Sequence, residues 1–391
     1  MKGIFVHADS IPKEGYKLKE YEKATGKIYQ SNMVWKNPRL ELRTDMPVPE
    51  VGDRDLLIQV KSCGICGTDV HLIEHDDEGY VIYPWHAKLN IALGHELSGI
   101  VAQVGKDVRD FMVGDYVCTE EMIWCGECIP CRNGFPNQCE RLEEIGITVN
   151  GGMAEYCVSP AKICWKLDSI RERYGDTHDV FDFGALVEPT SVAYNAIFER
   201  GQGFRPGAYA AIFGGGPVGQ LGTALIKVSG ASKVIVFEPQ EERRKLAKVM
   251  GADFVYDTNE LQKSGTSPAE VIMDVTHGRG ADVLMEASGV GHVVFPEMTK
   301  SLGVNAHIIQ TAMSGEPVPI LFPPMQGKAA QIFAAVGHSG NGTFENVIRL
   351  MGAGMIDVRP LVSATYSLDQ AVEAFDASKK RLDSVIMFQN K

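Results

Sequence analysis

The second half of the chain alternates between short, continuously apolar runs and longer stretches that carry charged residues. A run such as residues 208–213 predicts a strand that is buried on both faces, as in a parallel sheet. Strands that alternate with helical stretches predict βαβ units. The predicted order is strand 208–213, helix 217–228, strand 233–237, helix 241–250, helix 268–276 and strand 281–285.

The first half of the chain has a different pattern, in which glycine and proline separate short β-rich runs. Residues 56–60, 99–104 and 116–118 are such runs, and they predict an irregular antiparallel β domain. The polar segment 12–37 interrupts this pattern and contains several Lys, Glu and Tyr residues. We expect it to form a surface excursion between two strands.

The length of 391 residues and the change of pattern near residue 190 predict two domains in the α/β class. We expect residues 1–190 to form the β-rich domain and residues 191–335 to form the parallel-sheet domain. After residue 335 the pattern predicts a helix at 344–351 and a last strand at 384–388. The tail from 336 to 391 is therefore expected to complete the first domain.

Composition and charge exclude several classes of partner. Hydrophobic residues make up 45 % of the chain and charged residues 23 %, which is ordinary for a globular protein. The net charge of −12 argues against nucleic-acid and anionic-membrane partners. The sequence has no apolar run of the roughly 20 residues that cross a bilayer. The N-terminus becomes polar too early for a secretory signal, so we expect a cytoplasmic protein.

Nine cysteines are present, and four of them fall within fifteen residues of one another. An odd number in a long chain without an export signal argues against a disulfide framework. The four clustered thiols are Cys125, Cys128, Cys131 and Cys139. Their spacing lets one loop surround one ion, which predicts a closed, structural Zn²⁺ site. An iron–sulfur cluster or a set of scattered buried thiols would be the alternatives.

A second group of metal-binding residue types lies nearer the N-terminus. Cys66 and the pair His95-Glu96 offer a thiolate, an imidazole and a carboxylate within thirty residues. Three mixed ligands leave a fourth position open, which is typical of a catalytic zinc site. Each residue alone also fits ordinary core packing, but the combination, together with Glu188, favours a metal site.

The motifs named so far are similar to those of the zinc-dependent medium-chain dehydrogenases. The resemblance rests on the stretch 63–71 (Cys-Gly-Ile-Cys-Gly-Thr-Asp-Val-His), the triplet 94–96 (Gly-His-Glu) and the four-cysteine loop. It extends from about residue 39 to the C-terminus, and the branch with threonine, sorbitol and other polyol dehydrogenases resembles it most. It implies a GroES-like catalytic domain, a Rossmann domain and a homodimer or homotetramer.

The resemblance also implies roles for single residues in the metal site. Cys66, His95 and Glu96 match the ligands of the catalytic zinc. Glu188 stands where simple alcohol dehydrogenases have a ligating cysteine, and there it would bind the metal or hold its water. Cys63 matches no ligand and is expected to be a core thiol.

Two further residues match the family's proton relay. Thr68 matches the hydroxyl that takes the substrate proton, and His71 matches the imidazole that passes it to solvent. The polar segment 12–37 departs from the family, because shorter members lack it. Because of that departure, the resemblance does not determine the identity of the substrate or the subunit contacts, but it still implies the same reaction chemistry.

A Gly-x-Gly-x-x-Gly pattern follows the apolar run 208–213 and opens the predicted helix, which predicts a dinucleotide-binding turn. The helix N-terminus would meet the phosphate charge with free N–H groups. The expected contact positions are Gly214, Gly216, Pro217, Val218 and Gly219.

Glu238 ends the next predicted strand, where a carboxylate accepts hydrogen bonds from the ribose hydroxyls and repels a 2′-phosphate. It favours NAD over NADP, although the neighbouring Arg243 and Arg244 could accommodate that phosphate. By resemblance, Arg243 lies at the adenine side, and Ser288 lies near the nicotinamide ribose.

These observations predict a zinc-dependent oxidoreductase that transfers a hydride between a secondary alcohol and NAD and reversibly forms the ketone. Polyols, sugars, sugar acids, inositols and amino alcohols such as threonine are the expected substrate classes. Simple primary or short aliphatic alcohols are the alternative. A zinc-free quinone or enone reductase, and a dinucleotide-binding sensor without activity, are alternatives that the complete set of ligand residues disfavours.

Overall fold

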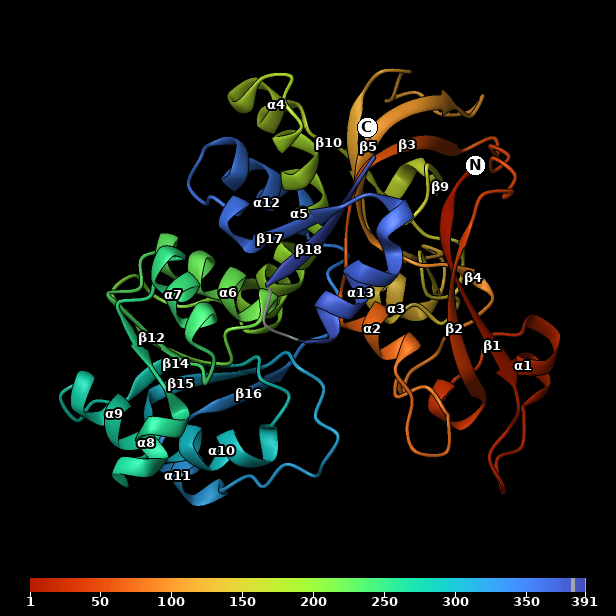
Figure 1. The fold of residues 1–391 in the computed structure, drawn as a ribbon. Helices are drawn as coiled ribbons and strands as arrows, with labels where there is room; N and C mark the ends of the chain where they lie inside the picture. Colours follow the sequence, from red (N-terminus) through yellow and green to blue (C-terminus); the bar gives the residue numbers. More distant parts are fainter. Residues whose placement is uncertain (381–383, 391) are drawn as a thin grey trace. The chain divides into compact units, whose positions relative to one another are not determined.

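The computed structural model describes residues 1–380 and 384–390, and it divides into two compact units (Figure 1). Unit 1 consists of Met1–Glu188 and Val362–Lys391, and unit 2 of Pro189–Leu361. The sequence pattern predicts that residues 336–361 belong to the first domain, whereas the structure places them in unit 2. The reason is helix α12 (Thr343–Gly352), whose Asn346 donates a hydrogen bond to Tyr194 of unit 2.

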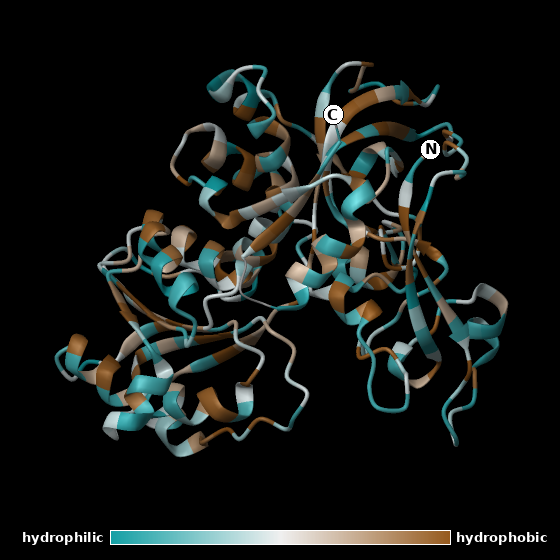
Figure 2. Cartoon of the chain, viewed as in Figure 1, coloured by the Kyte–Doolittle hydropathy of each residue, from teal (hydrophilic) through white to brown (hydrophobic). Residues whose placement is uncertain are grey.

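Unit 2 contains a six-stranded sheet in which all paired neighbours run parallel. The strand order is β13-β12-β11-β14-β15-β16, the doubly wound arrangement expected from the alternating pattern. The strands are β11 (Tyr209–Phe213), β12 (Lys233–Phe237), β13 (Phe254–Tyr256), β14 (Ala281–Glu286), β15 (Leu302–Gln310) and β16 (Gln331–Ala334). Figure 2 shows these strands largely in the hydrophobic colour, because helices cover the sheet.

Helices lie on both faces of this sheet, α6 and α7 on one face and α8 to α11 on the other (Figure 1). Local signals set their ends: Ser267 and Glu270 form a reciprocal capping box at the start of α9. The helices are α6 (Pro217–Val228), α7 (Glu241–Val249), α8 (Thr258–Ser264), α9 (Pro268–Val275), α10 (Gly291–Lys300) and α11 (Phe322–Lys328).

Unit 1 is built mainly from antiparallel strands, as the first half of the sequence predicts. Its largest sheet has the order β10-β6-β5-β3-β18-β17, and β9 also pairs with β3. These strands are β3 (Asp55–Gly64), β5 (Glu96–Val104), β6 (Tyr116–Thr119), β9 (Tyr156–Pro160), β10 (Cys164–Lys166), β17 (Val362–Tyr366) and β18 (Val385–Gln389). The C-terminal strand β18 thus lies directly beside β3.

Two smaller sheets complete the strands of unit 1. One has the order β2-β1-β4, and the other pairs β7 with β8. Their strands are β1 (Gly3–Ser10), β2 (Trp35–Arg43), β4 (Ile91–Ala92), β7 (Met122–Ile123) and β8 (Glu143–Glu144). The polar excursion lies between β1 and β2, as expected, and contains α1 (Glu20–Thr25).

Four further helices belong to unit 1, and a fifth crosses the division between the units. They are α2 (Gly67–Ile73), α3 (Ile129–Arg132), α4 (Asp168–Tyr174), α13 (Ala371–Lys379) and the crossing helix α5 (Asp179–Tyr194). A π-helical turn, η4 (Asn195–Arg200), continues α5. Within residues 1–380 and 384–390, no helix has the length and apolar character needed to cross a membrane.

Candidate active site

The predicted catalytic metal ligands come together in unit 1. Cys66 is the N-cap of α2, while His95 directly precedes β5 and Glu96 begins it. One ligand atom from each of the three lies within 4.8 Å of the others. His95 and Glu96 are buried and Cys66 is half-buried. The structure therefore brings together the three residues that the sequence motifs separate by almost thirty positions.

Asp69, a residue to which the sequence motifs assign no role, holds the two ligand segments in place. Its carboxylate accepts hydrogen bonds from the backbone N–H of Cys66 (2.9 Å) and from that of Gly94 (3.3 Å). The same carboxylate lies 3.8 Å from Nδ1 of His95, too far for a hydrogen bond but close enough for its charge to act on the imidazole. Gly94 has φ +94°, a backbone conformation that few side-chain-bearing residues adopt, which explains the glycine before His95.

The cluster is electrostatically suited to a cation. Burial, and then the Glu188 charge, raise the pKa of Glu96 to about 8. Burial likewise raises the pKa of Cys66 to about 11. Among the described residues, Oε2 of Glu96 has no hydrogen-bond partner. A divalent ion would reverse these shifts and bind that oxygen, so the residues fit a zinc ion.

Glu188 lies beside this cluster, but its carboxylate is not among the ligand atoms that lie within 4.8 Å of one another. Its carboxylate lies within 4.8 Å of that of Glu121, and its charge acts on Glu96 and Asp69. Both Glu121 and Glu188 are buried. No motif distinguishes Glu121 within the run 120–123, so the sequence alone does not identify it.

The two expected proton-relay residues lie on α2. Thr68 and His71 are three positions apart, so their side chains share one face of the helix. Both are half-buried and therefore reachable from solvent. Cys63, in contrast, is buried at the end of β3, where its thiol contacts the carbonyl of Gly64.

The four-cysteine loop forms the second metal-binding group in unit 1. Ligand atoms of Cys125, Cys128, Cys131 and Cys139 all lie within 4.8 Å of one another. The Sγ–Sγ distances are 4.0 Å for Cys125–Cys131 and 3.8 Å for Cys128–Cys139. A tetrahedron with Zn–S bonds of about 2.3 Å has edges of about 3.8 Å, so the thiols are spaced for zinc.

Backbone amides further prepare this loop for a cation. The N–H groups of Glu127 and Cys128 donate to Sγ of Cys125 at 3.4 and 3.3 Å. These bonds lower the pKa of Cys125 to about 6, which favours the thiolate that binds metal. Sγ of Cys139 accepts from the N–H groups of Cys125 and Arg141.

The glycine turn lies in unit 2 between β11 and α6, as the sequence predicts. Gly214 has φ +104°, and a Cβ there would lie 2.6 Å from the carbonyl oxygen of Ala287. A Cβ at Gly219 would lie 2.0 Å from the carbonyl of Gly214, so helix and strand pack closely only with glycine. At Gly216 a Cβ would meet nothing closer than Nη1 of Arg243, at 4.0 Å. The turn thus leaves open space where a phosphate could approach the backbone.

Glu238 is buried at the end of β12, directly beside this turn. Its Oε2 accepts from the N–H of Gly215 (2.7 Å), and its Oε1 accepts from the N–H of Gln240 (2.8 Å). These bonds fix the carboxylate beside the glycines, where a ribose would lie. Pro217 and Val218 form the first turn of α6 and are half-buried.

The two arginines after β12 differ in their surroundings. Arg244 forms an ion pair with Asp257 (3.0 Å) and donates to the carbonyl of Glu238, so it is engaged within unit 2. Arg243 is the arginine that lies near the glycine turn. Arg244 is therefore poorly placed to receive a 2′-phosphate.

Ser288 follows β14, which is the neighbour of β11 at the point where the strand order reverses. In open α/β sheets, ligands bind outside the carboxyl ends of the strands at this point. Ser288 is an exposed residue, and its hydroxyl donates to Oε1 of Glu286 at 2.5 Å. The N–H of Ala287 donates to the carbonyl of Phe213, which joins the two strand ends.

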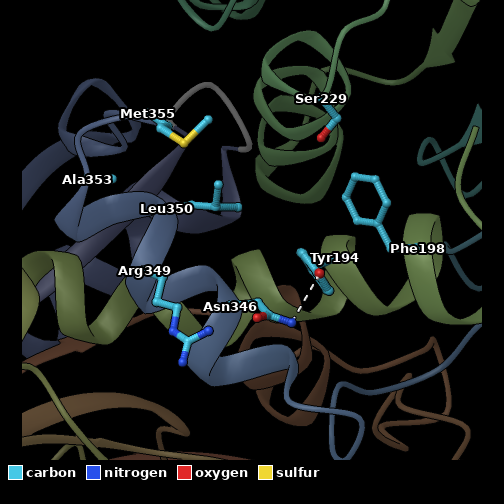
Figure 3. A pocket seen from close by; sticks show the side chains of 8 residues that line it. All are labelled: Tyr194, Phe198, Ser229, Asn346, Arg349, Leu350, Ala353 and Met355. Carbon is cyan, nitrogen blue, oxygen red and sulfur yellow. Dashed lines mark hydrogen bonds between the residues drawn. The ribbon is translucent and has the colours of Figure 1, made fainter. Parts of the chain in front are cut away.

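A separate cavity of about 390 Å³ lies in unit 2, away from these residues (Figure 3). Tyr194 and Asn346 form its polar side, where Nδ2 of Asn346 donates to the Tyr194 hydroxyl at 3.2 Å. The full lining is Tyr194, Phe198, Ser229, Asn346, Arg349, Leu350, Ala353 and Met355. It contains no group of metal-ligating type, so we do not assign the reaction to it.

Comparison with protein families gives two matches in chain order. Residues 52–169 match the model of the alcohol dehydrogenase GroES-like domain, and residues 217–353 match that of the zinc-binding dehydrogenases. The first match contains both predicted metal sites except Glu188, and the second contains the glycine turn from Pro217 onward.

Individual relatives agree with these matches. The chain is 41 % identical over 388 residues to scyllo-inosose 3-dehydrogenase of Thermotoga maritima. The aligned region covers 95 % of each of the two chains. It is 31 % identical over 338 residues to L-threonine 3-dehydrogenase of Bacillus subtilis, which covers 85 % of this chain and 90 % of the relative. A solved structure described as an alcohol dehydrogenase from Thermotoga maritima superimposes with a TM-score of 0.94 at 38 % identity over the whole of both chains.

Proposed function

Because the chain belongs to the zinc-dependent medium-chain alcohol dehydrogenases and uses zinc and a nicotinamide dinucleotide, we propose that it oxidises one ring hydroxyl of a cyclic polyol to the ketone. In the balanced reaction, alcohol and NAD⁺ give ketone, NADH and a proton. The observation that carries this proposal is the 41 % identity, over 95 % of both chains, to a relative named for a cyclic polyol ketone. The solved structure from Thermotoga maritima matches the whole of this chain, the polar excursion included.

We assign the catalytic zinc to Cys66, His95 and Glu96, with Glu188 beside it, and the structural zinc to the four-cysteine loop. Bound among those residues, the catalytic zinc supplies a Lewis acid that lowers the pKa of the substrate hydroxyl. Asp69 fixes the segments that carry Cys66 and His95, so the ligand atoms are arranged before the ion binds.

The remaining assigned residues move a proton or hold the dinucleotide. Thr68 accepts the hydroxyl proton, and His71 on the same face of α2 passes it to solvent. The glycine turn and the N-terminus of α6 bind the pyrophosphate, and Glu238 binds the ribose hydroxyls. Bound NAD⁺ supplies the hydride acceptor. Arg243 and Ser288 border the adenine and nicotinamide sides in this assignment.

A substrate comparison tests the proposal. We expect the wild-type enzyme to give its highest kcat/KM with an inositol or an inosose, compared with sorbitol, L-threonine and a primary alcohol. Primary alcohols should be at least about 100-fold poorer, because polar groups built to bind further hydroxyls would be left unpaired. NADH absorbance measures each rate. A highest kcat/KM with L-threonine or with a primary alcohol would contradict the proposal.

The dinucleotide preference has its own test at Glu238. We expect the wild type to prefer NAD, and Glu238→Gln to raise the KM for NAD about ten-fold, because a charged hydrogen-bond acceptor is lost. The same change should narrow the preference over NADP, because it removes the charge that repels the 2′-phosphate. The matched control is Glu241→Gln, an exposed residue of α7. A wild-type preference for NADP would overturn the role of Glu238.

We further propose that the protein is a cytoplasmic homo-oligomer. All nine cysteines are free, which suits a reducing compartment. Strand β16 is the edge of its sheet, and the exposed residues Ile320, Leu321 and Phe322 lie between β15 and β16 in the chain. An open strand edge near exposed apolar side chains supports pairing with a second copy.

A further inference from the structure

One group of buried and half-buried polar residues in unit 1 is used neither by the metal sites nor by the proton relay. It lies where the polar excursion meets the loop 80–88 and strand β8. The group consists of Tyr83 and His86 from the loop, Glu143 and Glu144 from β8, and Lys27 from the excursion. Buried polar groups are expensive unless they have partners, so a group of this size calls for an explanation.

The pair His86–Glu144 is the best-defined part of the group. Nε2 of His86 lies 2.5 Å from Oε2 of Glu144, whose side chain is only 7 % exposed. The second ring nitrogen of His86, Nδ1, has no hydrogen-bond partner among the described residues and is not fully buried. A histidine held by a buried carboxylate at one nitrogen presents its other nitrogen to an incoming group.

Tyr83 presents a second polar atom in the same way. Its side chain is 4 % exposed, and its hydroxyl, which is not fully enclosed, has no hydrogen-bond partner among the described residues. A buried tyrosine usually satisfies its hydroxyl. The charges that act on this hydroxyl belong to Glu144, Glu121, Cys66 and Asp69, so it lies near both the His86 pair and the metal cluster.

Backbone pairing connects the His86–Glu144 pair directly to the acidic residues beside the metal cluster. Met122 of β7 pairs with Glu144 of β8, and the N–H of Ile145 donates to the carbonyl of Glu121 at 3.0 Å. The Glu121 carboxylate in turn lies within 4.8 Å of that of Glu188. The carboxylate that holds His86 is therefore one short strand pair away from the metal-site acids.

The polar excursion contacts the segments that carry these polar residues. Nζ of Lys27, whose side chain is 6 % exposed, lies 2.7 Å from Oε1 of Glu143 and donates to the carbonyl of Leu142. Ile28 and Ala87 exchange backbone hydrogen bonds, both at 3.0 Å. The excursion is thus tied to both segments that carry the unassigned polar residues.

We propose that the Tyr83 hydroxyl and the His86 Nδ1 bind a second hydroxyl of the substrate, next to the carbon that is oxidised. The inference rests on the proposed function, since it presumes a substrate with neighbouring hydroxyls. Such a substrate satisfies two polar atoms that are otherwise unpaired, whereas an alcohol with a single hydroxyl leaves them so. A site of this kind discriminates strongly against the analogue that lacks the group. Tyr83 and His86 are therefore specificity-determining residues, and the polar excursion serves substrate selection.

The test compares three ring substrates on the zinc-loaded, NAD-supplied enzyme: cyclohexanol, a cyclohexanediol with neighbouring hydroxyls, and an inositol. For Tyr83→Phe and His86→Gln, we expect the ratio of kcat/KM for the diol to that for cyclohexanol to fall about ten-fold, as for a lost hydrogen bond. Tyr80→Phe and His75→Gln are the matched controls, and they should keep the wild-type ratio. If kcat/KM fell equally for the diol and for cyclohexanol, the two residues would have a merely structural role, and the inference would be overturned.

A binding measurement supplies a second readout that does not depend on turnover. By calorimetry, the dissociation constant of the inositol should rise about ten-fold in Tyr83→Phe, while the zinc content stays at the wild-type value. An unchanged dissociation constant would contradict the inference. The two proposals fail differently: a wild type that does not prefer ring polyols defeats the proposed function. If the wild type does prefer ring polyols but the variants keep its ratio of kcat/KM for the diol to that for cyclohexanol, only the role of Tyr83 and His86 is defeated.

Discussion

Cys66→Ser should reduce alcohol oxidation by about a thousand-fold or more while dinucleotide binding stays close to that of the wild type. The thiolate is one of three ligand atoms within 4.8 Å of one another, and a serine hydroxyl is a much poorer zinc ligand. Losing Lewis-acid assistance worth several kcal/mol accounts for an effect of this size. The glycine turn and Glu238 belong to unit 2, so the contacts proposed for them with the dinucleotide should be unaffected.

Zinc content by mass spectrometry, turnover, and NADH binding by fluorescence measure the three expected effects. Cys63→Ser is the matched control, because Cys63 is a buried thiol only three residues away that does not belong to the ligand cluster. The Cys66 variant should lose one zinc equivalent, and the Cys63 variant should lose none. Full turnover in Cys66→Ser would mean that the metal ligands have been wrongly assigned.

Removal of one thiol from the four-cysteine loop should act on stability instead of directly on the chemistry. In Cys131→Ala, three sulfurs remain, and the loop 125–139 loses the ion that closes it. Structural zinc contributes about 10 kcal/mol or more in small zinc-binding peptides, so we expect a clear fall in melting temperature. The loop contains the short helix α3, a 3-10 turn at Pro136–Gln138 and few buried apolar side chains to replace the metal.

Calorimetric melting of the zinc-loaded protein, with and without a chelator, checks this prediction. Cys157→Ala is the control, because Cys157 is a fully reduced, buried thiol of β9 outside both ligand groups. The chelator should lower the melting temperature of the wild type and of the control, but it should add little to the loss in Cys131→Ala. Equal melting temperatures for Cys131→Ala and the wild type would refute a structural zinc there.

Local signals explain why several elements could be predicted to within a residue. Helix α6 begins at Pro217 and ends at Val228, as expected, because proline at the first helical position follows the glycine turn. The capping box of Ser267 and Glu270 similarly marks the start of α9. The group of Cys66, His95 and Glu96 could be proposed from the sequence because Cys66 and the 94–96 triplet each lie within a recognisable short motif, and the structure brings their ligand atoms together.

The features that sequence reasoning missed depend on contacts between distant residues. Asp69 lies inside a quoted motif, but its link to Gly94 spans twenty-five positions and becomes visible only in the fold. The same holds for His86, whose partner Glu144 lies on another element. The amphipathic pattern of 344–351 predicts a helix correctly, but it does not reveal which unit that helix packs against.

The discontinuity of unit 1 has a consequence for synthesis in the cell. Strand β18 pairs with the end of β3, where Phe388 lies opposite Cys63 and the N–H of Ile65 donates to Ile386. Unit 2 is contiguous, so it can fold on the ribosome as soon as Leu361 has emerged. The segment that carries Cys66 instead waits for residues 385–389, which makes the catalytic half the last to mature and the stage most exposed to misfolding or degradation.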